Sequence, residues 1–180
     1  VTEVIEVTGA SGARGWQVFM HPCRELRLYF GHLSSLSPRL AAALVTPSRC
    51  TNNGSGSTSA RTCWYERLAV DIAAAEALGS GPDSAGVDFG VLDFRRAPAA
   101  FAIPAHYDAF YPYYAAPLEY FTPALAAQLA AKTGSVLGGR VRTAAPVGGS
   151  YAQDLAGTAQ GNWFVPGQTW SSAADTASFV

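Results

Sequence analysis

Lysine is almost missing from this chain of 180 residues, because Lys132 is the only lysine among the 12 basic residues. Charged residues make up only 14% of the chain, the net charge is −1, and no basic run occurs. The sequence therefore indicates neither nucleic acid nor an anionic membrane surface as a partner. It also lacks an apolar run long enough to span a bilayer, and it shows no signal peptide. Because the chain opens on Val1 rather than on methionine, we expect it to be a processed product or a fragment.

Several catalytic motifs are also missing. There is no His-Glu-x-x-His, no His-x-His, no Gly-x-Ser-x-Gly and no Cys-x-x-Cys, which leaves a serine triad unsupported. A pair formed by Cys23 with His21 or His32 lacks an activating partner. A catalytic zinc needs about three protein ligands. The available set is His32, Asp88, His21, His106 and either Asp71 or Asp93, and nothing in the spacing forces these residues together.

Cysteine is scarce, with three residues in all. Cys50 and Cys63 flank a loop, Thr51–Thr62, that is rich in Gly, Ser and Asn. Closing a loop of that size would stabilise the fold by roughly 3 kcal/mol, through the entropy of the unfolded chain. We therefore predict a disulfide between Cys50 and Cys63, and with it an oxidising, extracytoplasmic or secreted location. Cys23 would then be free or paired outside this chain.

The apolar residues that are present, 49% of the chain, are enough for a core. Alternating segments predict strands at Val1–Val7, Trp16–Met20 and Glu25–Leu33. A glycine-rich turn, Gly9–Gly15, separates the first two, and Pro22 is expected to end the second. Strands this closely spaced favour an antiparallel sheet, barrel or sandwich.

Further along, Pro38–Val45 predicts a short helix or an apolar connector. Strand patterns return at Trp64–Ile72 and at Val87–Phe94. Asp88 and Asp93 lie an odd number of residues apart, so a regular strand would point them to opposite faces unless it bulges at Gly90.

The second half of the chain differs in character. Pro98–Pro117 mixes prolines with tyrosines and phenylalanines, which predicts an irregular segment packed on the sheet. A helix is expected at Pro123–Lys132, with Thr122 as its N-cap and Gly134 as its C-terminal stop. A turn-rich β tail, Gly138–Gly167, follows. Aromatic side chains can also stack on sugars, and Tyr29 and Trp163 are our candidate binding residues.

The most informative stretch is Leu28–Ser37, which places His32 where an alternating strand gives way to a serine-rich turn. At neutral pH an imidazole in that position can act as a base, an acid or a ligand. The common alternative is a hydrogen-bonded histidine with a structural role only.

This stretch resembles a known family. Tyr29–Leu36 is similar to the Tyr-x-His-Leu-Ser segment of the lysostaphin-type (LytM-like) zinc peptidases, which cleave peptidoglycan cross-links. Val1–Val7 resembles the strand after that family's Ala-x-x-Gly-x-Val turn, and Glu76–Gly81 resembles its Gly-x-x-Ile-Gly-x-x-Gly turn. Val87–Val91 falls where the family has His-x-His-Phe-Glu-Val. The resemblance covers about residues 1–95 and implies a barrel-sandwich of the duplicated hybrid motif type.

The departures from the family pattern concern the metal. Gly86 and Asp88 stand where the family has its two His-x-His histidines, the second of which is a zinc ligand. The family's other two ligands, a His and an Asp, would precede Val1. The resemblance therefore implies a module that keeps the sheet without the zinc centre, with His32 as a vestigial catalytic residue and Asp88 as a substitute ligand at best. Biotinyl and lipoyl carriers share this plan, but they need a lysine at a hairpin tip, whereas Lys132 ends the expected helix.

We accordingly expect a mainly β fold: an antiparallel barrel-sandwich core over residues 1–95, and an extension over residues 96–180 with one short helix, packed on the core. The expected function is that of a non-catalytic extracytoplasmic module that binds cell-wall polymer or a partner protein, without a cofactor. The alternative is an active zinc-dependent peptidoglycan endopeptidase completed by ligands outside this chain.

Overall fold

A computed structural model describes residues 1–81, 86–135, 139–143, 145, 147, 149, 157–159, 161–169 and 176–179. The chain divides into two compact units, Val1–Phe89 and Gly90–Val180.

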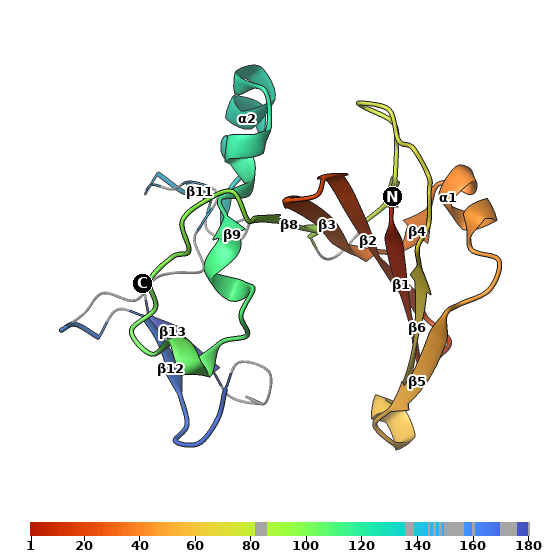
Figure 1. Cartoon of the computed structure of the whole chain (residues 1–180), viewed down its shortest axis with the longest axis horizontal. Helices are drawn as coiled ribbons and strands as arrows, with labels where there is room; N and C mark the ends of the chain where they lie inside the picture. The colour runs from red at the N-terminus through yellow and green to blue at the C-terminus, as the bar shows by residue number, and fades with distance from the viewer. Residues whose placement is uncertain are drawn as a thin grey trace. The chain divides into compact units, whose positions relative to one another are not determined.

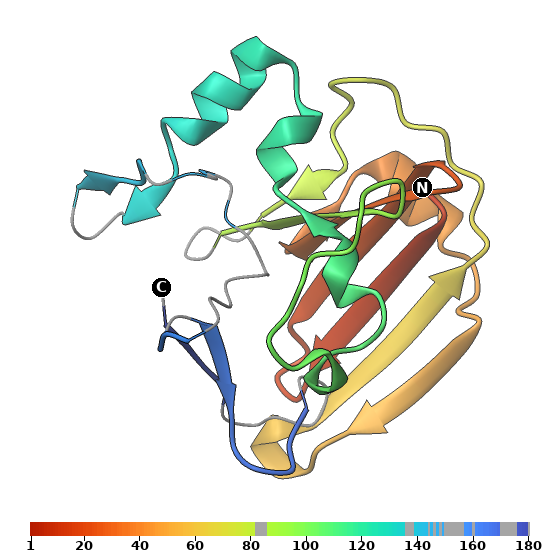
Figure 2. The same cartoon turned by 60° about the vertical axis from the view of Figure 1, so that its left-hand side comes forward.

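The first unit is built on an antiparallel sheet with the strand order β5-β6-β1-β2-β3 (Figures 1 and 2). Its strands are β1 (Glu3–Gly9), β2 (Arg14–Cys23), β3 (Leu26–Leu33), β5 (Arg49–Asn53) and β6 (Ala60–Glu66). The predicted strands over Val1–Val7 and Glu25–Leu33 are thus confirmed. The turn within Gly9–Gly15 is also confirmed, since the Gly9 amide donates to the Ala13 carbonyl.

The core of this unit lies between one face of the sheet and helix α1 (Pro38–Ala43) (Figure 1). Val4, Val18 and Leu33 come from the sheet, and Leu40 is the buried residue of the helix. Ser37 caps the helix by accepting from the Leu40 amide, and Pro38 occupies the first turn, where no amide is needed. The segment 38–45 is therefore a helix and not a connector.

Three predicted boundaries were wrong. Strand β2 continues past Pro22, because its pairing with β3 shifts register between Met20 and Cys23 and no regular ladder bond is required there. Half of Thr51–Thr62 is paired, as the end of β5 and the start of β6, and residues 54–59 connect the two strands. Strand β6 ends at Glu66, well before Ile72.

The predicted disulfide is confirmed. Cys50 and Cys63 face each other across the β5–β6 ladder, with Cα atoms 4.1 Å apart, and their sulfurs are bonded. This spacing is that of an antiparallel pair whose residues do not exchange hydrogen bonds, where side chains are closest. Cys23 is free and exposed.

Two very short strands, β4 (Ser35–Leu36) and β7 (Gly79–Ser80), form an antiparallel pair just after His32. Gly79 is required there. A Cβ atom at residue 79 would lie 2.0 Å from the Ser35 carbonyl oxygen, so no side chain fits between the two backbones.

The second unit has short elements joined by irregular segments. Strand β8 (Asp88–Asp93) begins in the first unit and pairs, by its later residues, with β9 (Tyr114–Ala115). Between them lie the 3-10 turns η2 (Pro104–His106) and η3 (Tyr111–Tyr113), and η4 (Pro117–Tyr120) follows. The aromatic segment is irregular, as expected. Phe101 is buried and stacks on Tyr107, with ring centroids 3.9 Å apart.

Helix α2 (Pro123–Ala130) begins at the predicted residue and ends two residues early. Thr122 holds the N-cap position, but its side chain makes no capping bond. Gly134 does not form the expected stop, since it belongs to β10 (Gly134–Ser135), which pairs with β11 (Arg140–Val141). The last pair is β12 (Gly161–Phe164) with β13 (Thr176–Phe179). Much of the tail Gly138–Gly167 lies outside the described residues.

The mainly β, antiparallel class is therefore confirmed, and the described residues contain two α-helices in place of the single one expected. In the described parts of the chain, no sheet closes into a barrel, and the barrel-sandwich stays a prediction. None of the helices in those parts is both long and apolar enough to cross a membrane.

Candidate functional site

His32 lies on a β-bulge at the end of β3. Trp16 pairs with Leu33 and Val18 pairs with Phe30, so that Gly31 and His32 together face the single residue Gln17 on β2. His32 takes up the extra residue with a left-handed backbone, at φ = 57°. Histidine enters this region more readily than most residues. As a result the His32 side chain is exposed, while both Phe30 and Leu33 pack into the core.

Asp88, at the start of β8, lies beside this bulge. Its Oδ2 is 3.1 Å from His32 Nε2, close enough for a hydrogen bond and, when the imidazole is protonated, an ion pair. Gly31 makes this approach possible, because a Cβ atom at residue 31 would lie only 3.3 Å from the Asp88 Cβ. The structure thus brings together the two residues that the sequence singled out as catalytic and metal candidates.

The surroundings of this pair are partly apolar and partly backbone. Phe30 and Phe89, from the same two strands as the pair, stack with ring centroids 4.7 Å apart. The Ser34 hydroxyl lies 3.2 Å from the Ser80 carbonyl oxygen and 3.0 Å from that of Gly81. This hydroxyl is therefore bound to the β7 backbone. Both His32 and Asp88 stay open to water, with side-chain exposures of 65% and 59%.

The other metal candidates lie elsewhere and have other partners. His21 Nδ1 is 2.7 Å from the Thr2 hydroxyl, and burial, followed by the nearby Arg27 charge, lowers the pKa of His21. His106, in the second unit, meets the Phe164 ring edge-on. Asp93 is buried and held by Arg95, and Asp71 is exposed.

The donors present do not fit a zinc centre. Among the described residues, no group of three or more His, Cys, Asp or Glu side chains is arranged to hold a metal ion. His32 and Asp88 supply two donors, where a zinc site takes three or four. What the pair offers is an exposed imidazole beside a carboxylate, which can exchange protons with a ligand or accept and donate hydrogen bonds.

The two aromatic candidates differ in accessibility. Tyr29 is half-buried on β3, with its ring 5.9 Å from that of Phe19. Trp163 on β12 is 51% exposed, and its indole N–H donates to the Ala159 carbonyl at 2.9 Å. That bond orients the indole ring of Trp163 and leaves much of the side chain accessible, as a sugar-stacking residue requires.

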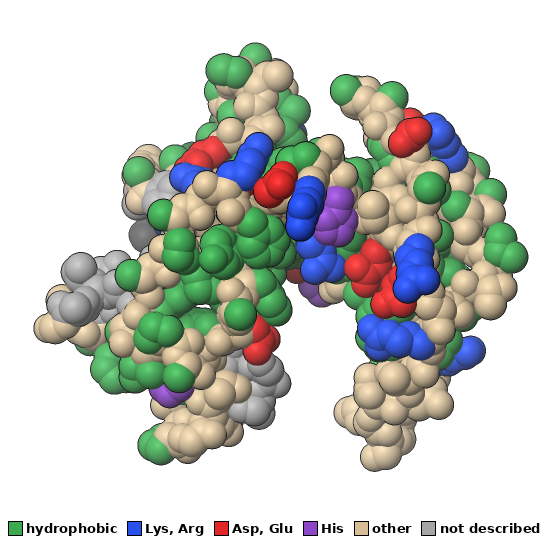
Figure 3. All heavy atoms as spheres, viewed as in Figure 1, with side chains coloured by type: hydrophobic (Ala, Val, Ile, Leu, Met, Phe, Trp, Pro, Cys, Tyr) green, Lys and Arg blue, Asp and Glu red, His purple; other side chains and the backbone are tan. Residues whose placement is uncertain are grey.

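Basic and acidic side chains are interspersed on the first unit in the view of Figure 3. Many of them pair with each other, including Arg14 with Glu6, Arg27 with Glu3, Arg39 with Glu76 and Arg49 with Glu66. Arg27 also covers the Phe19 ring and Arg49 the Trp64 ring.

Sequence reasoning missed the role of Asp93 in the second unit. The residue is 4% exposed, and its carboxylate accepts from Arg95 Nε and Nη2 at 2.7 Å and from the Tyr120 hydroxyl at 2.6 Å. The Arg95 bonds, chiefly, hold the pKa of Asp93 well below its usual range. Arg95, two residues further on, was a signal for such a pair, but Tyr120 is 27 residues away and no local pattern connects it.

No protein-family model, no curated protein and no solved structure matches the chain.

Proposed function

We propose that this chain is a non-catalytic extracytoplasmic module that is related to the lysostaphin-type zinc peptidases and binds cell-wall polymer. The observation that carries the proposal is the 3.1 Å contact between His32 and Asp88. The family resemblance aligns Asp88 with a histidine that ligates zinc beside the His32 position. Contact between His32 on β3 and Asp88 on β8 supports the idea that the family's strand arrangement is retained. The aspartate in place of a zinc-binding histidine supports the idea that the metal centre has been lost.

Three further features support a binding module in an oxidising compartment. His32 Nε2 contacts the Asp88 carboxylate, and among the described residues no third metal donor joins this pair. Both side chains are open to a ligand, and so is the Trp163 ring in the second unit. The Cys50–Cys63 disulfide agrees with an oxidising compartment, where a wall-binding protein would be found.

Co-sedimentation with purified peptidoglycan, together with metal analysis of the protein, tests this proposal. We expect saturable binding to the wall fraction, no released wall peptides and no stoichiometric zinc. Trp163→Ala should weaken that binding more than Trp163→Phe, which keeps an aromatic face. A protein that binds neither zinc nor peptidoglycan would point to a partner protein as the ligand.

A second candidate is an active zinc endopeptidase whose remaining ligands come from outside this chain. The exposure of His32 beside a carboxylate favours it, since a general base must reach its substrate. Stoichiometric zinc, together with wall-peptide cleavage that is lost in His32→Ala, would overturn the non-catalytic proposal.

Restoring the family's His-x-His motif at residues 86 and 88 tests separately whether the strand arrangement around His32 is retained. Gly86 lies two residues before Asp88, the first residue of β8, and a Cβ atom at residue 86 would meet nothing within 4 Å. In an extended backbone, residues two positions apart point to the same side. Gly86→His combined with Asp88→His should therefore create zinc binding together with His32. The matched control, Gly86→Ala with Asp88→Ala, should not. Equal zinc affinity of the two variants would contradict the proposed frame.

A further inference from the structure

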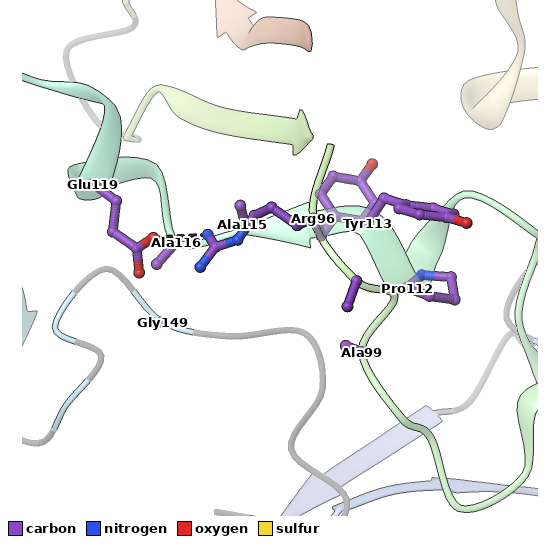
Figure 4. Close-up of a pocket in the computed structure, with 10 residues that line it drawn as sticks. Arg96, Ala99, Pro112, Tyr113, Ala115, Ala116, Glu119 and Gly149 are labelled. Atoms are coloured by element: carbon purple, nitrogen blue, oxygen red, sulfur yellow. Dashed lines mark hydrogen bonds and ion pairs between the residues drawn. The ribbon is translucent and has the colours of Figure 1, made fainter. Parts of the chain in front are cut away.

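The second unit contains a pocket that the function proposed above does not use. Its volume is about 210 Å³, and Figure 4 shows its lining. Arg96 and Glu119 are its charged residues, Tyr113 and Tyr114 also line it, and Ala99, Ala115 and Ala116 contribute small apolar surfaces. Pockets for drug-sized ligands measure roughly 300–1,000 Å³. This pocket therefore suits a smaller molecule.

Two opposite charges lie side by side in its wall. Arg96 Nη1 donates to Glu119 Oε2 at 2.7 Å, and Figure 4 shows the guanidinium directed at the carboxylate. The two side chains are 47% and 50% exposed. A guanidinium has five N–H donors and a carboxylate about four acceptor positions. The contact between them therefore leaves each group able to bind a ligand as well.

The elements that carry these charges are tied together. The Arg96 amide donates to the Asp93 carbonyl, and the Asp93 carboxylate binds the hydroxyl of Tyr120, the neighbour of Glu119 in η4. The hydrogen bond between Arg96 and Glu119 is the main cause that raises the pKa of Arg96 above its ordinary value, and a hydrogen bond with Tyr120 adds to it. The charge pair is thus held in position before any ligand arrives, which reduces the entropy lost on binding.

The pocket also has an apolar neighbour. A second depression of about 400 Å³ shares Ala116 and Glu119 with it and is lined mainly by Leu118 and by alanines of α2. A ligand bound at the charge pair can therefore place a small apolar group against alanine side chains.

We propose that this pocket binds the zwitterion of an α-amino acid with a small apolar side chain. Its carboxylate would pair with Arg96, its ammonium group with Glu119, and its side chain would lie against the alanines. A zwitterion satisfies both wall charges at once, whereas a simple anion or cation leaves one of them without a ligand partner. This inference does not rest on the function proposed for the chain.

Titration of the isotope-labelled protein with alanine, followed by amide chemical shifts, tests the proposal. We expect saturable shifts around residues 96 and 119. Propionate lacks the ammonium group and alaninamide lacks the carboxylate, so each should bind at least about tenfold more weakly, a loss of roughly 1.4 kcal/mol.

Variants separate a binding role from a structural one. Arg96→Gln and Glu119→Gln should each weaken alanine binding by about tenfold or more. Glu119→Gln keeps an acceptor for Arg96 and guards against simple unfolding. Arg39→Gln, which breaks a partly exposed Arg–Glu pair in the first unit, should leave the binding unchanged. The proposal is wrong if glycine, alanine and valine all fail to saturate, or if folded Glu119→Gln and Arg96→Gln bind like the wild type.

Discussion

At the scale of single residues, His32 shows how backbone conformation and site formation are connected. Its left-handed φ lets the strand bulge, and the bulge turns the imidazole outward to Asp88. Such a conformation costs most non-glycine residues about 1 kcal/mol or more. The exposed pair with Asp88 returns only about 0–1 kcal/mol. The position is therefore not optimised for stability, as is common where a residue serves a site.

We expect His32→Gly to be more stable than His32→Ala by about 1 kcal/mol, because glycine adopts φ = 57° freely and alanine does not. Both variants lose the contact with Asp88, so the difference between them isolates the backbone. Urea denaturation measures it. Equal stabilities of His32→Gly and His32→Ala would mean that residue 32 leaves the left-handed conformation once the imidazole is removed.

Asp93 should make the stability of the protein depend on acid pH. Because its folded-state pKa is lowered, it stabilises the fold at pH values above the unfolded pKa of about 3.9, and this contribution is lost as the pH falls below that value. Asp93→Asn should cost about 1–3 kcal/mol at neutral pH and flatten the acid limb of the stability curve. Denaturation between neutral and strongly acidic pH checks both effects, with the exposed Asp71→Asn as the control.

At the scale of elements, patterns and structure agree where one face of a strand is buried. Strands β1 and β3 alternate because one side of each packs on α1. Strand β5 lies at the edge of the sheet, and most of its residues are exposed. Because its Thr and Asn residues are polar, the sequence pattern predicted a loop there. Leu68, Val70 and Ile72 alternate and pack on the core, yet they belong to an irregular segment. Their alternation reflects burial on the core. The Leu68 and Val70 amides do donate to the Thr2 and Val1 carbonyls, but the regular strand has ended at Glu66.

The β4–β7 pair should be sensitive to Gly79. A Cβ atom there would overlap the Ser35 carbonyl at 2.0 Å, so Gly79→Ala must push the two backbones apart, at a cost of about 1–3 kcal/mol. Gly86→Ala, in open space, is the matched control. Thermal denaturation measures the cost, and amide shifts at residues 32–36 report the local change. A Gly79→Ala protein as stable as Gly86→Ala would contradict this packing.

The disulfide should stabilise the β5–β6 hairpin. Replacing both Cys50 and Cys63 by alanine should lower the free energy of unfolding by roughly 3 kcal/mol, because the unfolded chain regains the freedom of the closed loop. Urea denaturation with and without reductant checks this. Alkylation of the denatured, non-reduced protein should label Cys23 alone. Labelling of all three cysteines would mean that the bond does not form.

At the scale of the whole molecule, the two units have different cores. The first is aliphatic, around Val4, Val18 and Leu40. The second contains a chain of ring contacts that links Phe101, Tyr107 and Phe164. Truncating a buried side chain in one unit should therefore destabilise that unit.

Leu40→Ala should destabilise the first unit by about 2–5 kcal/mol, and Phe101→Ala should destabilise the second by about 3–5 kcal/mol. Hydrogen exchange measured by mass spectrometry should show faster exchange in residues 1–89 for the former and in residues 90–135 for the latter. Val45→Ala, at an 86% exposed position, should change neither. Equal acceleration in both units from either variant would indicate one cooperative core.

The sequence by itself determined those features that depend on near neighbours. These are the antiparallel strands β1 and β3, the proline-started helix α2, and the Cys50–Cys63 pair across a short connection. Side-chain alternation and loop closure act over a few residues and can be read directly. Only the tertiary structure decided that Asp88 meets His32 over Gly31, that Tyr120 reaches Asp93, and that Arg96 and Glu119 share a pocket. Each of these contacts joins residues 23 or more positions apart, and such contacts depend on bulges, register and packing that no local pattern encodes.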